Sequence, residues 1–477
     1  MKAPFSPYLT SIKDGLKHLI ALLREDYPYV SVLATDSKGL AVRISRHARS
    51  VGSETMTTER GIVVRVYQNG GYSEYALNDF DPNDPAKAAA EIKEALCAQQ
   101  ALLSLTETKI YETPMIADDP KTLFVEMETE ELPETCDTKA LVAKLTECSD
   151  KAAAMDERIV EAMARAQSTH ISKLFLTQNR DLSQSYVYSE GTLVTVAVED
   201  GKNQTGYKGL SGLVGPELFS EMESLVEPAV KEATELLLAE HIIPGEYDVI
   251  TSPEVSGLIA HEAFGHGVEM DMFVKNRALG KDYIDKRVGS DLVTMHEGAL
   301  CAKDVTSYAF DDEGTLAGDV TEIDHGILKT GICDQLSALR LGTAPTGNGK
   351  RENFEHKVYT RMTNTIFDSG ESTLEEMIAS IDYGYLLEGM ESGMEDPKHW
   401  GIQCIVKSGR EIKNGRLTGK IVAPIIMTGY VPDLLGHVSM LSKDREVFGT
   451  GGCGKGYKEW VKVADGGPYM KTKARLG

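Results

Sequence analysis

The sequence lacks any apolar run that approaches the ~20 residues needed by a membrane-spanning helix. Its opening stretch, MKAPFSPYLT, has no signal-peptide pattern. Cysteine is scarce, with seven residues among 477, and no two of them form a C-x-x-C pair. These absences argue against a disulfide framework and a membrane anchor, so we expect a cytoplasmic protein with reduced thiols.

Basic residues are also in short supply. The chain has 50 Lys and Arg against 73 Asp and Glu, which gives a formal net charge of -23. A surface this negative repels phosphate backbones and anionic lipids, so we expect neither nucleic acid nor a membrane as partner. The hydrophobic fraction of 42% and the charged fraction of 26% are typical of a globular protein. A chain of 477 residues is too long for one ordinary core, which predicts two or three domains.

The first half of the chain shows the order helix, strands, helix. Apolar residues recur at helical spacing between Tyr8 and Glu25, alternating stretches follow, and Asp84-Pro85 begins a second helix. The order then recurs, with a helix predicted near 152–167, further strands, and a helix from about Pro216 to Ala239. We therefore predict a mixed α/β domain over residues 1–240.

Glycines in the two parts of this domain align at a constant spacing. Gly61 lines up with Gly191, and Gly71 with Gly201, at an offset of about 130 residues. Two explanations fit this spacing. The domain is either a duplicated helix–antiparallel-strands–helix unit or two ordinary antiparallel sheets.

The texture of the sequence changes beyond about residue 242. Short alternating stretches and glycines dominate, and Asn414-Gly415 is a strong signal for a hairpin turn. We place the boundary at 240–246 and predict a mostly antiparallel β domain over residues 241–477. The whole chain is thus expected to have an α+β fold.

The stretch HEAFGHG, residues 261–267, opens this second domain. Ser252 and Pro253 are a good N-cap and first helical residue, so His261 and Glu262 fall late in a helix. The familiar zinc motif H-E-x-x-H places two histidines four residues apart on one helix face. Here they are five apart, which on a regular helix separates them by roughly 140°. A single π-type turn, which Gly265 would tolerate, would bring His266 back over His261.

Two histidines leave a zinc ion short of a third protein ligand. The candidates are Glu269, Asp271, His296, His437 and Cys453. Cys453 lies in GTGGCGKG, residues 449–456, a stretch with so few side chains that its backbone is free to bend sharply and approach another group closely. A thiolate is a strong zinc ligand, whereas Glu269 and Asp271 are also suited to support a ligand histidine.

With these motifs, the chain resembles the TldD/PmbA family, on its TldD side. The resemblance is carried by four stretches of the second domain, whose order fits the family pattern: HEAFGHGVEMD at 261–271, DDEGTLAGD at 311–319, RMTNT at 361–365 and GTGGCGKG at 449–456. The spacing H-E-x-x-x-H is itself a feature of the family. The first domain matches mainly in layout.

The resemblance implies a zinc metallopeptidase of the cytosol that acts on unfolded or extended peptides. His261, His266 and Cys453 would bind the zinc ion, and Glu262 would activate the zinc-bound water that attacks the scissile carbonyl. The peptide would bind as an added strand at a sheet edge. The family includes PmbA (TldE) proteins that lack the zinc motif and pair with TldD, so we expect a dimer, either homo-oligomeric or with such a partner.

Other interpretations of these residues remain open. His261 and His266 could be ordinary helix-end histidines, Cys453 a buried free thiol, and DDEGT simply a turn. Arg361 and Asn364 could orient substrate. The alternative function is a non-catalytic regulatory protein of the gyrase-modulator kind, with a structural metal or none. Glu262 separates the two hypotheses, because a purely structural site has no need of a carboxylate beside its ligands.

Overall fold

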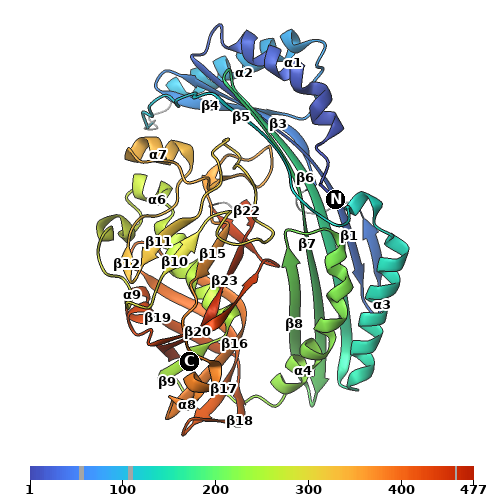
Figure 1. Ribbon diagram of the computed structural model, residues 1–477, viewed down its shortest axis with the longest axis vertical. Coiled ribbons are helices and arrows are strands. Elements are labelled where there is room, and N and C mark those ends of the chain that lie inside the picture. Colours follow the sequence, from blue (N-terminus) through green and yellow to red (C-terminus); the bar gives the residue numbers. More distant parts are fainter. Residues whose placement is uncertain (53–57, 106–110, 457–458) are drawn as a thin grey trace.

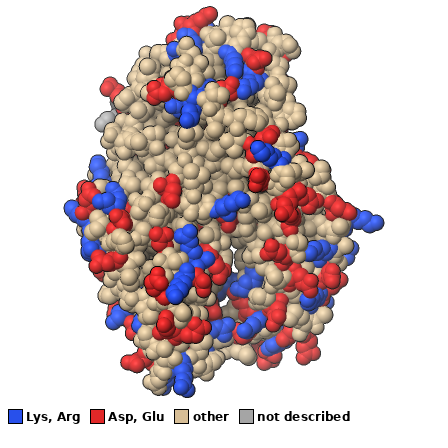
Figure 2. All heavy atoms as spheres, in the orientation of Figure 1, with Lys and Arg blue, Asp and Glu red and all other residues tan. Residues whose placement is uncertain are grey.

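The computed structural model describes residues 1–52, 58–105, 111–456 and 459–477. It confirms the α+β class, with about 26% helix and 42% strand. Two large sheets face each other along the molecule (Figure 1), one from the first half of the chain and one from the second. Acidic and basic side chains are interspersed over the face shown in Figure 2. No helix in the described part of the chain is long and apolar enough to cross a membrane.

The first sheet has eight strands in the order β4-β3-β1-β6-β7-β5, with β2 beside β1 and β8 beside β7. Its strands are β1 (Tyr29–Ile44), β2 (Arg49–Gly52), β3 (Arg60–Gln68), β4 (Gly71–Leu77), β5 (Lys121–Glu126), β6 (Ile159–Leu176), β7 (Arg180–Glu199) and β8 (Lys202–Gly212). The helical segments that accompany it are α1 (Pro7–Leu23), α2 (Pro85–Ser104), η1 (Pro133–Thr135), α3 (Thr138–Met155), η2 (Pro216–Leu225) and α4 (Val226–Leu236). The predicted helix start at Asp84-Pro85 is confirmed, since the Asp84 side chain accepts the Lys87 N–H.

The pairing of β1 with β6 favours the duplicated unit. These central strands are antiparallel, and Gly39 lies opposite Thr169, which is 130 residues further along the chain. An internal two-fold axis between copies offset by 130 residues requires this register. The turns Asn69-Gly70 and Asp200-Gly201 are also equivalent, because both residues of each have a positive φ. The equivalent of Gly201 is therefore Gly70, not Gly71.

The helix predicted near 152–167 is wrong. Helix α3 ends at Met155, and the following residues form the long strand β6. Ala162, Ala164 and Ala166 are fully buried at every second position, in the cluster that includes α3 and α4. Alanine favours helices, but this period of two is that of a strand, and the small side chains let both helices pack close to the sheet.

The second sheet has eleven strands and is mostly antiparallel, with parallel pairing only between β15 and β23 and between β16 and β9. Its main path is β12-β11-β10-β15-β23-β19-β17-β16-β9. The strands are β9 (Gly245–Thr251), β10 (Met295–Glu297), β11 (Val320–Asp324), β12 (Ile327–Leu328), β15 (Asn364–Phe367), β16 (Tyr383–Asp396), β17 (Gly401–Lys413), β18 (Arg416–Val422), β19 (Ile425–Tyr430), β20 (Met440–Phe448) and β23 (Ala464–Leu476). The hairpin at Asn414-Gly415 is confirmed, with a positive φ at both residues.

Smaller elements complete this half. Two ribbons pair β13 (Gly349–Lys350) with β14 (Tyr359–Thr360) and β21 (Gly452–Lys455) with β22 (Glu459–Lys462). The helical segments are α5 (Pro253–Ala260), η3 (His261–Gly265), η4 (His266–Val268), α6 (Asp271–Val274), η5 (Leu279–Tyr283), α7 (Gln335–Leu341), α8 (Leu374–Ala379) and α9 (Val431–Gly436). The division into domains at residue 240/241 stays a prediction.

The acidic DDEGT segment joins the two halves. Its turn is confirmed, because the Asp311 carboxylate accepts the N–H groups of Glu313 and Thr315, both at 2.9 Å. The next two carboxylates reach across to the first sheet. Asp312 pairs with Lys173 of β6, and Glu313 pairs with Arg65 of β3 at 2.5 Å. This motif is therefore more than a turn, since it holds the two sheets in a fixed relation.

Candidate metal centre

The helix that carries the two histidines begins and ends as the sequence predicts. The Ser252 side chain accepts the Val255 N–H, and Pro253 occupies the first helical position of α5. After Ala260 the backbone widens into the π turn η3, in which the His266 N–H donates to the His261 carbonyl. The predicted five-residue turn is thus confirmed. It places the two imidazole rings side by side, with centroids 5.1 Å apart.

Gly265 closes the π turn where no larger residue fits. A Cβ at this position would lie 2.2 Å from Sδ of Met362, which is itself fully buried. The preceding Phe264 is buried against Trp400, with ring centroids 5.3 Å apart. The turn is therefore held on one side by an aromatic contact and on the other by close approach to Met362.

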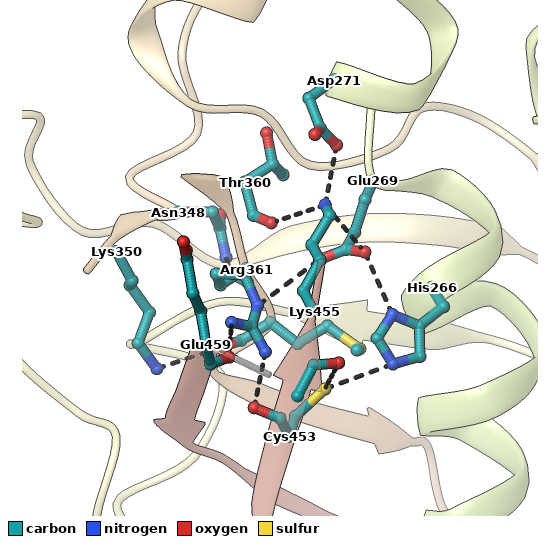
Figure 3. Close-up of polar contacts among 12 residues, drawn as sticks. His266, Glu269, Asp271, Asn348, Lys350, Thr360, Arg361, Cys453, Lys455 and Glu459 are labelled. Atoms are coloured by element: carbon teal, nitrogen blue, oxygen red, sulfur yellow. Dashed lines mark hydrogen bonds and ion pairs between the residues drawn. The ribbon is translucent and has the colours of Figure 1, made fainter. Parts of the chain in front are cut away.

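Cys453 completes a three-residue cluster. It lies on β21, and its Sγ is 3.2 Å from Nε2 of His266 (Figure 3). One ligand atom from each of His261, His266 and Cys453 lies within 4.8 Å of the other two. Across residues 1–52, 58–105, 111–456 and 459–477, no other group of three His, Cys, Asp or Glu residues comes together in this way. One thiol and two imidazoles form a donor set suited to zinc.

Two contacts hold the cysteine segment in place. The buried Arg361 donates to the carbonyls of Cys453 at 2.7 Å and Glu459 at 2.8 Å, one on each strand of the ribbon (Figure 3). The Gly449 N–H donates to Oγ of Ser211 at 2.8 Å. Because Ser211 belongs to β8, the first sheet helps to position a segment of the second half.

Glu269 supports His266 and is not part of the cluster. Its Oε2 lies 3.0 Å from Nδ1 of His266 and 3.1 Å from Nζ of Lys455 (Figure 3). Burial alone would raise the pKa of Glu269, but Lys455 and His266 outweigh it and lower the pKa to about 2. The resulting carboxylate fixes the His266 ring so that Nε2 faces Cys453, the arrangement that metal-ligating histidines usually have.

Asp465 has a similar place beside His261, which sequence reasoning missed. Its Oδ2 lies 4.0 Å from Nδ1 of His261, and both residues are buried. Burial raises the pKa of Asp465 to about 7, against the lowering effect of His261. The only local signal was its position before Gly466-Gly467, at the start of the last strand.

The three clustered side chains shift one another's protonation. Burial would raise the pKa of the Cys453 thiol, but His261 and His266 outweigh it and hold the pKa well below its ordinary value. Cys453 in turn raises the pKa of His261 to about 9, although burial opposes this. The site thus favours a thiolate, which is the form of cysteine that binds metals.

Glu262 faces the same cleft as the cluster. It is 7% exposed, and burial raises its pKa above the ordinary carboxyl value. Gly393 of β16 lies directly against it, because a Cβ there would come within 2.3 Å of Cγ of Glu262. The cleft has a volume of about 840 Å³ and is lined by Glu262, the three clustered residues and the segment 390–395 of β16.

One edge of β16 is free beside the cleft. β9 pairs only with residues 384–387 of this strand, whereas β17 covers the other edge along its whole length. No further strand among the described residues pairs with 388–396. A stretch of unpaired backbone groups therefore runs past the cluster.

The other candidates from the sequence lie elsewhere. His296 pairs with Asp319 at 2.8 Å and Asp368 at 3.4 Å, and His437 is exposed at the end of α9. Asp271 is bound to lysines, at 2.8 Å to Lys455 and 3.0 Å to Lys275. Substrate orientation by Arg361 and Asn364 is not favoured. Both side chains are buried in contacts with the protein's own backbone and side chains.

Comparison with known proteins agrees with this picture. A family model described as "PmbA/TldA metallopeptidase C-terminal domain" matches residues 244–474. A metalloprotease of Methanocaldococcus jannaschii is 33% identical over 281 residues, which cover 59% of this chain and 61% of that protein, less than two thirds of its length. A metalloprotease TldD homolog of Buchnera aphidicola is 30% identical over 336 residues and 68% of each chain.

Two further relatives bear on the metal and the fold. A zinc metalloprotease TldD homolog of Saccharolobus solfataricus is 32% identical over 232 residues, 48% of this chain and 51% of that protein. The crystal structure of TldE from Thermococcus kodakarensis superposes with a TM-score of 0.77 at 17% identity, over 97% of this chain and 100% of that one. The latter likeness concerns the fold alone. Taken with the family model and the Buchnera relative, these matches show that the chain belongs to the TldD/PmbA family of metallopeptidases.

Proposed function

We propose that the protein is a zinc-dependent peptidase whose metal is held by His261, His266 and Cys453. The observation that carries the proposal is the convergence of these three side chains with Glu262 in one open cleft. Two imidazoles and a thiolate suit zinc, and three protein ligands leave a fourth position for water or substrate, as in catalytic zinc sites. Names of relatives that include "metalloprotease" and "zinc metalloprotease" support the same proposal.

Zinc at this site would supply Lewis acidity, polarising the scissile carbonyl and lowering the pKa of water toward ~7. Glu262 is then the general base, since its carboxylate takes a proton from the attacking water and passes it to the leaving amine. Burial raises the pKa of Glu262, which brings its basicity closer to what proton transfer near neutral pH requires. Glu269 and Asp465 hold the rings of His266 and His261 from behind.

The substrate of this proposal is an extended peptide. The unpaired edge of β16 between 388 and 396 offers main-chain donors and acceptors beside Glu262 and the cluster. A peptide added as a strand there would be recognised through its backbone, which folded proteins do not expose. Gly393 on this edge has no side chain to keep the peptide away from Glu262.

A single substitution tests the mechanism. Glu262→Gln should bind zinc as the wild type does but cleave an unstructured peptide roughly 10²–10⁴ times more slowly, the usual contribution of a general base. Glu246→Gln, an exposed glutamate of β9, is the matched control and should keep full activity. Zinc content is measured by atomic emission and cleavage by mass spectrometry. A zinc-loaded Glu262→Gln variant of undiminished activity would contradict the mechanism, and a zinc-loaded wild type that cleaves nothing would favour a structural metal.

We further propose that the active protein is a dimer, formed with a second copy or with a TldE-like chain. The likeness of fold to a TldE protein supports a pairing of similar chains. Light scattering of the purified chain, alone and mixed with such a partner, measures the mass of the particle. A monomer under both conditions would refute this part of the proposal.

A further inference from the structure

A second cavity lies behind the cysteine segment. It has a volume of about 430 Å³, within the range of roughly 300–1,000 Å³ typical of ligand pockets. Strands β1, β6 and β7 of the first sheet form one wall, and segments of the second half form the other. Six aromatic side chains line it, which are Tyr186, Tyr188, Tyr308, Phe310, Phe354 and Trp460. Aromatic residues make up only 7% of the chain, so we name this cavity the aromatic chamber.

The aromatic chamber and the metal cleft share a wall. Gly451, Gly452 and Trp460 line both of them, and Gly452 directly precedes Cys453. A Cβ at Gly451 would have no atom within 4 Å, and one at Gly452 would meet its nearest neighbour only at 3.4 Å. These glycines are therefore not required by packing or by a positive φ. Their effect is to leave the boundary between cleft and chamber free of side chains.

The charged groups of the chamber indicate a neutral occupant. Its lysine and arginine side chains are largely paired with carboxylates of the protein, as in Lys173–Asp312, Lys462–Glu190 and Arg351–Glu74. Burial lowers the pKa of Lys350 to about 7, and burial raises the pKa of Glu59 to about 7. The surroundings thus favour the uncharged form of both groups. What remains for a ligand is the aromatic and aliphatic surface.

We propose that the aromatic chamber binds a large apolar side chain, preferably aromatic, of the peptide being cleaved. The peptide main chain would lie along the edge of β16, and a residue near the scissile bond would extend past Gly451 into the chamber. This inference rests on the proposed function and adds a side-chain preference to it. Rings favour such a site because aromatic pairs gain about 0.5–1.5 kcal/mol beyond the area they bury.

A binding experiment tests the chamber without cleavage or metal. The probe is N-acetyl-phenylalaninamide, titrated into the zinc-free wild-type chain while tryptophan emission is recorded. Trp460 is 45% exposed and lines the chamber, whereas Trp400, the other of two tryptophans, is fully buried. We expect a saturable change with this probe and none with N-acetyl-alaninamide. The absence of a saturable change, or equal responses to both probes, would overturn the proposal.

Cavity-filling variants link the chamber to cleavage. Two peptides that differ only by Phe or Ala at one position are compared, with each position near the scissile bond tried in turn. The wild type should prefer Phe at one position by roughly tenfold or more in kcat/KM, the discrimination that an apolar pocket gives. Val305→Phe and Ile171→Phe, both at lining residues, should bring this ratio close to one and leave cleavage of the Ala peptide unchanged.

Val198→Phe is the control, because it adds the same atoms at an exposed site of β7 outside the chamber. It should keep the wild-type ratio. Thermal unfolding shows which variants are folded, and the probe titration of the wild type decides the matter if neither filled variant folds. A preference that survives in a folded, filled variant would overturn the proposal. Failure of all peptide cleavage would instead count against the proposed function, since the probe titration does not depend on it.

Discussion

Nε2 of His266 lies 3.2 Å from Sγ of Cys453, although 187 residues separate the two in the chain. Neither residue reaches the other through local structure. The π turn directs His266, and Arg361 together with Ser211 holds the cysteine segment against it. The predictions below test this arrangement and the contacts that surround it.

Cys453→Ser should weaken zinc binding by more than the roughly 10–100-fold that loss of a supporting residue costs, because a ligand itself is removed. Competition with a chelating dye measures the affinity. Cys97→Ser, which removes an exposed thiol, is the control and should bind zinc normally. Equal affinities in both variants would remove Cys453 from the site.

Gly265→Ala should destabilise the protein by about 1–3 kcal/mol, the usual cost of overpacking a core. The new Cβ would come within 2.2 Å of Sδ of Met362. Adding Met362→Ala creates the missing space, so the double variant should lose less stability than the two single losses added together. Denaturant unfolding measures all three, and strict additivity would show that the close approach is harmless.

Gly393→Ala should lower cleavage by tenfold or more without changing zinc affinity. Its Cβ would lie 2.3 Å from Cγ of Glu262, so the carboxylate must move, and small displacements of a catalytic group are costly. Gly401→Ala is the control, since nothing lies within 4 Å of the added atom. Peptide cleavage at matched zinc occupancy compares the two, and equal rates would contradict the placement of Glu262.

Arg65→Met should cost about 3–5 kcal/mol of stability, as loss of one partner of a buried ion pair does. It leaves Glu313, which is 2% exposed, without its 2.5 Å partner on the other sheet. The exposed Arg60 pairs with Asp36 at 2.9 Å, and Arg60→Met should cost only about 0–1 kcal/mol. Adding Glu313→Gln to Arg65→Met should recover part of the loss in urea unfolding, and no recovery would argue against the pair.

Glu322 should make stability fall as the pH rises. Its side chain is fully buried, neither oxygen has a hydrogen-bond partner among the described residues, and burial holds its pKa well above the ordinary value. Above the pKa of ~4.3 in the unfolded chain, the folded protein keeps a proton that the unfolded chain has released. Folding therefore loses up to about 1.4 kcal/mol per pH unit through this group.

Glu322→Gln removes this dependence. Its stability relative to the wild type should grow steadily from pH 5 to pH 8 in urea unfolding. Glu246→Gln, at an exposed position, is the control and should stay parallel to the wild type. A constant difference between Glu322→Gln and the wild type would mean that Glu322 is ionised in the folded protein.

Errors in the sequence predictions had physical causes. The residues near 152–167 contain several alanines, whose helix propensity hid the strand period of β6. The DDEGT stretch was rightly predicted as a turn, but its ion pairs to Lys173 and Arg65 could not be seen, because they join residues 139 and 248 positions apart. Arg361 was considered for substrate, whereas its contacts with backbone carbonyls depend on a ribbon formed elsewhere in the chain.

By itself, the sequence determined what is local. The cap at Ser252, the π turn between His261 and His266, and the hairpin at Asn414-Gly415 each arise within a few residues, where spacing, glycines and capping side chains specify the backbone. Tertiary structure alone selected Cys453 from five candidate partners, placed Glu269 and Asp465 behind the histidines, and enclosed the aromatic chamber. Those relations require the packing of two sheets against each other, which no short stretch of sequence encodes.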